Sequence, residues 1–282
     1  MGWLTEKDSP YPNIETWEIE AVLFAMNDED QKVPLKVREV IPQLSRFIEA
    51  LVERIKQGGR LIYAGSGTSG RIGVLDAAEC PPTFGVPSDR VIGIIAGGEA
   101  ALRGPIEAAE DDEAAAQTEL QRLQLCEKDT LFAISASGRT PFALGAALYA
   151  RKVGALTGAF TANPNTPLEN LVEHPIVVIT GPEVLTGSTR LKAGTATKLI
   201  LNMITTAAFT RLGHVRNSRM VDLQLLNRKL WQRATHYLME ATGLSLQEAE
   251  TLLREMGSLR KALDHLHLPS QEEGQNEKES PQ

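Results

Sequence analysis

The sequence predicts an α/β protein in which helices cover both faces of a parallel five-stranded sheet. Short apolar segments alternate with helical stretches through the middle of the chain, and such alternation is typical of a parallel sheet. Helical patterns precede the first apolar segment, and beyond Gly213 the chain again reads as helices alone. We therefore expect a three-layer sandwich with N-terminal helices and a small C-terminal helical appendage. With 282 residues the chain is long enough for one large domain and such an appendage.

The N-terminal region is predicted to be an extended arm followed by helices. Polar residues and prolines continue to about Asn13, and helical patterns cover residues 14–27 and 33–56. In the second pattern apolar residues recur every three or four positions, as one buried face of a helix requires. Gly58 and Gly59 are expected to end that helix.

Short apolar segments are the predicted strands of the sheet. They are Leu61–Ala64, Val91–Ala96, Thr130–Ser135, Ala155–Thr161 and Ile176–Thr180. Helices are expected between them near residues 69–79, 101–124 and 140–153.

A long apolar helix, predicted over Arg190–Leu212, follows the last strand and is expected to be buried on most sides. Ser245 and Glu248 form an S-x-x-E capping box for a short helix, and Ser258 is expected to open another. These patterns divide the chain into an arm with helices (1–50), a sheet domain (51–220), a helical subdomain (221–268) and a disordered polar tail (269–282).

Composition argues against several classes of function. With 29 basic and 36 acidic residues the net charge is −7, so nucleic acid is not an expected partner. No apolar run reaches the roughly 20 residues that span a bilayer, so no membrane contact is expected, and the first residues lack a signal-peptide pattern. The 2 cysteines and 5 scattered histidines offer no disulfide framework and no metal site. We expect a cytoplasmic protein with no metal and no other cofactor.

A glycine-rich loop, AGSGTSGR at residues 64–71, follows the first predicted strand. Its G-x-G-x-x-G spacing suits a dinucleotide, but the acidic residue expected at the end of the second strand, Glu99, comes late and in a glycine turn. A triphosphate loop needs Lys and then Ser or Thr after its last glycine, where this chain has Arg71 and Ile72. The loop therefore predicts an anion site at a helix N-terminus, without naming the anion.

A second turn, SASGRTP, follows the third predicted strand. At the carboxyl edge of a parallel sheet, turns after neighbouring strands converge. Hydroxyls and backbone amides there suit a small phosphate ester bound without metal, although any one serine could simply cap a helix. The hydroxyl residues of the two turns are Ser66, Thr68, Ser69, Ser135, Ser137 and Thr140.

With these motifs the sequence resembles the bacterial N-acetylmuramic acid 6-phosphate etherases, members of the sugar isomerase (SIS) superfamily of phosphosugar-binding domains. The resemblance rests on GSGTSGR, LDAAECPPTFG, IAGGE, EAAED, SASGRTP and LTGSTRLKAGTATKLILNM. It begins near Glu6, runs through MVDL at residues 220–223 and continues more weakly beyond. ECPPTFG and GSTRLKAGTATK are specific to the family, whereas SASGRTP marks only the superfamily.

The resemblance implies a homodimeric, cytoplasmic enzyme of peptidoglycan recycling with an SIS-type αβα sandwich and sugar phosphate sites near the subunit contact. Such an enzyme removes D-lactate from C3 of N-acetylmuramic acid 6-phosphate and leaves N-acetylglucosamine 6-phosphate. The two carboxylates of the family correspond to Glu79 and Glu110. The superfamily's phosphate contacts correspond to Ser135, Ser137 and Thr140, and contacts from the first turn to Thr68 and Ser69.

Two positions depart from the family pattern. The arm reads TEKDSPYPN where the family usually has Arg-Asn-Pro, and Ala108 stands where glycine is common before Ala-Glu-Asp. The first change concerns a contact with the partner subunit, and the second concerns the placement of Glu110.

Glu79 has the position expected of a general acid. Pro81 and Pro82 are expected to end the preceding helix close to it. The negative end of the helix dipole, together with burial beside Phe84, would then disfavour its ionisation, as an acid working near neutrality requires. Elimination of lactate needs such an acid and a base at C2, and it needs no electron-carrying cofactor.

The remaining residues leave alternatives open. Nothing in the run EAAEDDE selects Glu110 over its acidic neighbours except the resemblance. Arg139, Ser188 and Lys192 are weaker candidates for the wall of the site, while Cys80 lacks a partner histidine and is expected to pack in the interior. Two other functions fit the same fold: a non-catalytic sugar-phosphate sensor similar to glucokinase regulatory protein, and an aldose–ketose isomerase.

Overall fold

The computed structural model describes residues 3–106 and 108–266, and the predicted disordered tail at 269–282 lies outside them. The chain divides into two compact units. The first comprises the residues up to Glu79 together with Ser88–Ala208, and the second comprises Cys80–Pro87 and the chain from Phe209 onward.

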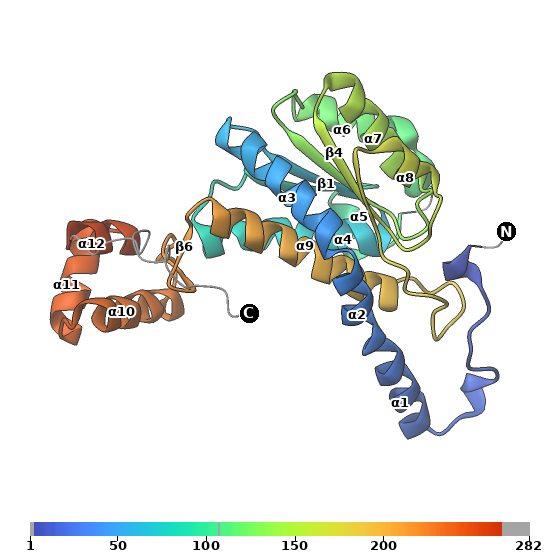
Figure 1. Ribbon diagram of the computed structural model, residues 1–282, viewed down its shortest axis with the longest axis horizontal. Coiled ribbons are helices and arrows are strands. Elements are labelled where there is room, and N and C mark those ends of the chain that lie inside the picture. The colour runs from blue at the N-terminus through green and yellow to red at the C-terminus, as the bar shows by residue number, and fades with distance from the viewer. Residues whose placement is uncertain (1–2, 107, 267–282) are drawn as a thin grey trace, which may run out of the picture. The chain divides into compact units, whose positions relative to one another are not determined.

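A parallel five-stranded sheet forms the centre of the first unit, as the sequence predicts (Figure 1). Its strand order is β2-β1-β3-β4-β5, so the chain reverses its direction of winding between β1 and β3. The strands are β1 (Leu61–Gly65), β2 (Val91–Ile95), β3 (Thr130–Ile134), β4 (Leu156–Thr161) and β5 (His174–Val177). The fifth strand ends earlier than predicted, and β1 and β3 are buried along their whole length.

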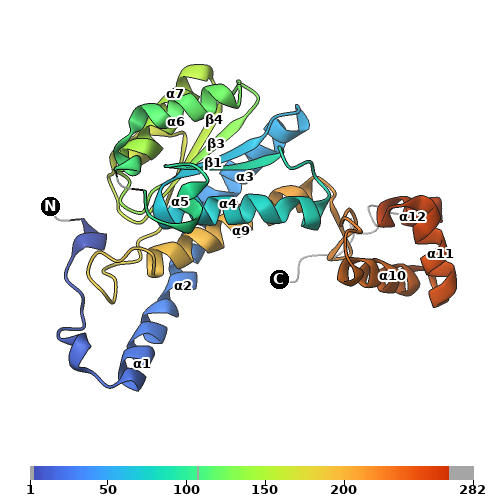
Figure 2. The same ribbon diagram turned by 180° about the vertical axis from the view of Figure 1, so that it is seen from behind.

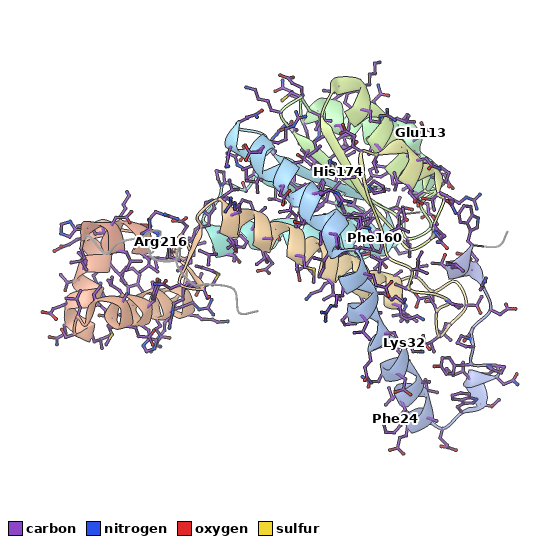
Figure 3. All side chains as sticks on the ribbon, in the orientation of Figure 1. Phe24, Lys32, Glu113, Phe160, His174 and Arg216 are labelled. Atoms are coloured by element: carbon purple, nitrogen blue, oxygen red, sulfur yellow. The ribbon has the colours of Figure 1, made fainter. Side chains whose placement is uncertain are left out.

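Helices cover both faces of this sheet, as Figures 1 and 2 show from opposite sides. On one face α6 (Glu113–Arg122), α7 (Pro141–Val153) and α8 (Pro167–Leu171) pack on a cluster rich in alanine. On the other face lie α3 (Ile41–Lys56), α4 (Gly67–Phe84) and α9 (Lys192–Arg211). The rings of Phe47 and Phe132 pack there with centroids 5.0 Å apart, and the same rings approach Gly158 so closely that no side chain fits. Figure 3 labels Phe160 within this layered core.

The N-terminal helices follow the predicted pattern but are shorter and more numerous. They are two 3-10 helices, Leu4–Glu6 and Ile14–Thr16, followed by α1 (Ile19–Asp30) and α2 (Lys32–Glu39). The predicted helix 33–56 breaks at Val40, because Pro42 has no N–H to bond a preceding carbonyl and instead lies in the first turn of α3. In Figures 1 and 2, α1 extends away from the sheet.

The predicted helix near 101–124 is interrupted as well. Only α5 (Ala100–Arg103), a 3-10 turn (Ala109–Asp111) and α6 are helical there. Gly104 and Pro105 end α5, because the residue before a proline avoids helical backbone angles. The interruption leaves Glu110 on a short turn beside the sheet instead of within a helix.

In the part that the structure describes, which ends at Leu266, the second unit contains a β-hairpin and three helices of its own. The hairpin pairs β6 (Val215–Arg216) with β7 (Arg219–Met220), and the helices are α10 (Arg228–Thr242), α11 (Leu246–Met256) and α12 (Leu259–His265). The predicted capping box of Ser245 and Glu248 is confirmed, and Ser258 caps α12 as predicted. Leu238, Leu253 and Leu259 are fully buried in a core of their own. Within residues 3–106 and 108–266, no helix is long and apolar enough to cross a membrane.

Candidate functional site

The two hydroxyl-rich turns follow neighbouring strands at the carboxyl edge of the sheet. Gly65 at the end of β1 pairs in register with Ile134 at the end of β3. Ser66 and Ser135 are therefore the first residues beyond a paired position. A methyl group on Gly65 would lie 3.0 Å from the carbonyl oxygen of Ile134, so the backbones approach closely here. The convergence expected for a ligand at a switch point is present in the backbone.

The first turn leads directly into α4. Gly67 adopts a left-handed φ of 50°, and the amide of Gly70 donates to the carbonyl of Ser66 at 3.1 Å. Gly70 also lies so close to Gly65 that a Cβ would come within 2.6 Å of the Gly65 carbonyl. Thr68 and Ser69 lie in the first turn of α4, where backbone N–H groups have no partner within the helix. This arrangement suits an anion.

The hydroxyls of the second turn are already joined to one another. Ser135 Oγ lies 2.8 Å from Thr140 Oγ1 and 3.2 Å from Ser137 Oγ, and it accepts the amide hydrogen of Gly138 at 3.0 Å. Ser135 is buried, which restricts it to this geometry. Gly138 has a φ of 67°, and any Cβ there would lie 2.4 Å from Thr166 Oγ1. The turn is thus a compact set of preorganised hydroxyls.

Glu110 is brought to the first turn. Its Oε2 accepts a hydrogen bond of 3.4 Å from Ser66 Oγ, and its carboxylate is otherwise exposed. Its neighbour Asp112 caps α6 by accepting the amide hydrogen of Ala115 at 2.9 Å. That capping role is a local signal that removes Asp112 from the candidates. Ala108 has a left-handed φ of 57°, a conformation that glycine adopts with less strain than alanine.

Glu79 lies away from the two hydroxyl-rich turns, toward the C-terminal end of α4. The expectation that its helix ends at Pro81 is wrong, because α4 continues to Phe84 and the amide of Gly85 donates to the carbonyl of Pro81 at 2.9 Å. Glu79 is exposed, so neither the helix end nor the burial expected around it is present. Since a helix rises about 1.5 Å per residue, Glu79 lies about 16 Å along α4 from Thr68. This chain alone does not bring Glu79 to the two turns.

The weaker candidates make structural contacts. Lys192 is buried and its Nζ forms an ion pair of 2.5 Å with Glu29 Oε2 on α1. Burial alone would raise the pKa of Glu29, but hydrogen bonds from Lys192, Lys32 and Tyr11 outweigh it and hold that pKa at about 2. The guanidinium of Arg139 stacks on the ring of Trp3 at 5.1 Å.

Other residues near the turns are held by backbone groups. Arg71 donates to the carbonyls of Leu102 and Gly104, at 3.2 and 3.3 Å, and so supports the segment that leads to Glu110. Ser188 precedes α9, and a Cβ on Gly194 in its first turn would lie 3.4 Å from Thr68 Cγ2. The segment around Ser188 and Gly194 therefore borders the glycine loop.

Cys80 is buried, as predicted.

Sequence reasoning missed two features of this edge. Glu183 is fully buried and accepts the amide hydrogens of Lys192 and Ala193 at 3.0 Å, where burial raises its pKa despite these bonds. Thr5 is also fully buried and pairs with Asn163. Neither pairing has a local sequence signal, since its partners are 9 or more residues apart. Among residues 3–106 and 108–266, no group of three or more His, Cys, Asp or Glu residues could hold a metal ion.

The strand order β2-β1-β3-β4-β5, with hydroxyl turns after β1 and β3, places the chain in the class of doubly wound parallel α/β proteins whose ligands bind at the switch point. Residues 43–151 match the family model described as the glucokinase regulatory protein N-terminal SIS domain. The fold is similar to that of phosphoheptose isomerase from Neisseria gonorrhoeae, with a TM-score of 0.51 and 12% identity over 68% of this chain and 100% of that one.

Curated relatives narrow this class to one family. The chain is 48% identical to N-acetylmuramic acid 6-phosphate etherase of Bacteroides fragilis (strain ATCC 25285), over 93% of both chains. It is 51% identical to the etherase of the same name from Jannaschia sp. (strain CCS1), over 86% of this chain and 77% of that one. The chain belongs to the N-acetylmuramic acid 6-phosphate etherase family.

Proposed function

We propose that this protein is a carbon–oxygen lyase that cleaves the D-lactyl ether of N-acetylmuramic acid 6-phosphate and releases N-acetylglucosamine 6-phosphate and D-lactate. The observation that carries the proposal is the 48% identity to a named etherase over 93% of both chains. The match to a glucokinase regulatory protein domain covers only residues 43–151, so it supports the sensor alternative much less. A role in peptidoglycan recycling in the cytoplasm stays a prediction from the family resemblance.

In this proposal the 6-phosphate binds between the two turns. Ser135, Ser137 and Thr140 donate hydroxyl hydrogens to its oxygens. Ser66, in the glycine loop, and Thr68 and Ser69, in the first turn of α4, add their hydroxyls and backbone amides. The preorganised bonds around Ser135 Oγ, at 2.8 and 3.2 Å, support this assignment, because little reordering is then needed on binding. A dianionic phosphate also gains from the positive end of the α4 dipole.

The chemistry proposed is an elimination followed by hydration. With the sugar ring open, a base removes the C2 proton, and the electron pair forms a C2–C3 double bond. The C3–O bond breaks, and an acid protonates the departing lactate oxygen. Water then adds its oxygen to C3 while C2 takes up a proton, which restores the saturated sugar. Glu110 and Glu79 are the two proposed proton-transfer groups.

We further propose that the two carboxylates of one site come from different copies of the chain. Glu110 bonds Ser66 in its own chain, whereas Glu79 lies on an exposed face of α4 about three turns from Thr68. Beside Glu79 the side chain of Leu75 is 57% exposed, and on α9, which Asn202 joins to α4 by a hydrogen bond to Asp76, Met203 is 37% exposed. An exposed apolar surface next to a catalytic candidate fits a homodimer contact.

A second exposed apolar surface supports the same assembly. Ile19, Leu23 and Phe24 are exposed on α1, and Figure 3 labels Phe24 near the end of α1 that lies farthest from the sheet. Exposed apolar side chains on a helix that extends from the body gain stability when another surface covers them.

Incubation of the purified protein with N-acetylmuramic acid 6-phosphate tests the proposal. We expect stoichiometric D-lactate and N-acetylglucosamine 6-phosphate, with solvent deuterium at C2 of the product when the reaction runs in D2O. Binding of the phosphosugar without lactate release would reject the lyase and favour the sensor. Lactate release without deuterium at C2 would reject the elimination route while keeping the enzyme.

A further inference from the structure

The N-terminal segment, residues 3–9, lies across the carboxyl edge of the sheet and is held there by hydrogen bonds. Thr5 is fully buried, its amide donates to Asn163 Oδ1 at 3.1 Å, and its hydroxyl accepts from Asn163 Nδ2 at 2.9 Å. Asn163, also fully buried, follows β4. A reciprocal pair of hydrogen bonds in a dry environment fixes both residues, because breaking either bond would leave a buried polar group unpaired.

The same anchor reaches the proposed phosphate turn. Asn163 Nδ2 also donates to the carbonyl of Ala136 at 3.0 Å, within SASGRTP. The ring of Trp3 stacks on the guanidinium of Arg139, one residue before Thr140. The segment therefore lies against the turn whose hydroxyls are proposed to hold the phosphate.

Ser9, at the other end of the segment, forms hydrogen bonds with the loop before α9. Ser9 donates from its hydroxyl to the carbonyl of Val184 at 2.6 Å and from its amide to Thr186 Oγ1 at 2.9 Å. The same loop runs on through Ser188 into the first turn of α9, where Gly194 borders Thr68 of the glycine loop. Residues 3–9 thus connect the edges of both proposed phosphate turns.

Glu6 lies between these two anchors. Its side chain is exposed, and its Oε2 lies 3.4 Å from the position that a Cβ on Gly187 would take. In the part of the chain that the structure describes, its carboxylate makes no hydrogen bond and no ion pair. A carboxylate whose backbone is fixed and whose oxygens have no protein partner is available to bind a ligand, since only the side chain has to be ordered on binding.

We propose that Glu6 is a sugar-recognising residue whose carboxylate accepts hydrogen bonds from hydroxyl or amide N–H groups of the bound amino-sugar phosphate. This inference rests on the proposed function, because it assumes that the phosphate binds at the Ser135 turn. A carboxylate is only an acceptor and repels a phosphate dianion, so its partner must be the neutral, donor-bearing part of the ligand. Glu6 would thereby discriminate a sugar phosphate from phosphate alone.

Binding measurements on two ligands test this role. For Glu6→Ala we expect the Kd of N-acetylglucosamine 6-phosphate to rise about tenfold or more, as loss of a hydrogen bond to a charged group predicts. The Kd of inorganic phosphate should stay within about twofold, because Glu6 makes no contact with it. Glu6→Gln, which keeps the shape but loses the charge, should fall between. Glu15→Ala, an exposed glutamate of the same arm, is the matched control.

The outcomes separate this inference from the proposed function. An unchanged Kd for N-acetylglucosamine 6-phosphate in Glu6→Ala would overturn the role of Glu6. An equal rise in both Kd values would also overturn it, because the substitution would then disturb the phosphate turn itself. Absence of lactate release by the wild-type protein would reject the lyase, while the two-ligand comparison would still decide the role of Glu6.

Discussion

The turn at Ser135–Thr140 and the face of α4 around Glu79 are two parts of the proposed site, and they differ in completeness. In the turn, the buried hydroxyl of Ser135 is bonded within one chain to the half-buried hydroxyls of Ser137 and Thr140 and to the backbone. Around Glu79, the carboxylate and its neighbour Leu75 are exposed. A single chain can therefore prepare the phosphate site, whereas the chemistry, in our proposal, needs a second copy of the chain.

The largest expected effects come from the two carboxylates. Glu79→Gln and Glu110→Gln should each lower kcat by about 10²–10⁴-fold, because each removes one proton-transfer group, while phosphosugar binding persists. D-lactate release measures turnover, and Asp111→Asn, on the same 3-10 turn as Glu110, is the control. Near-normal turnover in either glutamine variant would remove that residue from the proposed chemistry.

A smaller effect is expected in the turn. Ser135→Ala removes the hydroxyl that links Thr140, Ser137 and the amide of Gly138, so KM should rise about tenfold or more with a smaller change in kcat. Initial rates over a range of substrate concentrations measure both constants. The exposed Ser45→Ala on α3 should behave as wild type. A fall in kcat at unchanged KM would contradict a binding role for this turn.

Disruption of the buried ion pair of Lys192 and Glu29 is expected to have the smallest effect on catalysis. Its main effect should be on stability. Lys192→Met removes the buried ammonium partner of the Glu29 carboxylate, which keeps only Lys32 and Tyr11, and should lower the free energy of unfolding by about 3 kcal/mol. Lys36→Met, which breaks an exposed pair with Glu39, should cost less than about 1 kcal/mol. Urea unfolding at neutral pH measures both. An equal free energy of unfolding for the two variants would show that the buried pair contributes no more to stability than the exposed pair.

The same pair predicts a pH dependence. The pKa of Glu29 in the folded protein is about 2, below its ordinary value of 4.5. Its contribution to stability is therefore present above pH 4.5 and is lost as the pH falls from 4.5 toward 2. The difference in unfolding free energy between wild type and Lys192→Met should narrow over this range. A difference independent of pH would contradict the ion pair.

Much of the fold could be predicted because its signals are local. Buried parallel strands are short apolar runs, and capping residues such as Ser245 bond within one turn of their own position. The hydroxyl turns after β1 and β3 were likewise visible as motifs, and their convergence followed from the rule for parallel sheets. In these cases the sequence neighbourhood contains the physical cause.

The features that the sequence did not predict correctly depend on residues far apart in the chain or on weak local signals. Two prolines do not end α4, because the turn beyond them is still closed by the bond from Gly85 to Pro81 and by packing of Phe84 on Phe209, with ring centroids 4.9 Å apart. Thr5 and Asn163 are 158 residues apart, so no local pattern could predict their pairing. The exposed position of Glu79 depends on the same continuation of α4.

A mixture of Glu79→Gln and Glu110→Gln chains, co-expressed or reassembled, tests the shared site most directly. If the two glutamates of one site come from different chains, each mixed dimer contains one site with both. Random pairing should then restore about a quarter of the wild-type rate of D-lactate release, because half of the dimers are mixed and half of their sites are complete. If both glutamates act within one chain, no complete site forms, and the mixture should release lactate no faster than either variant alone.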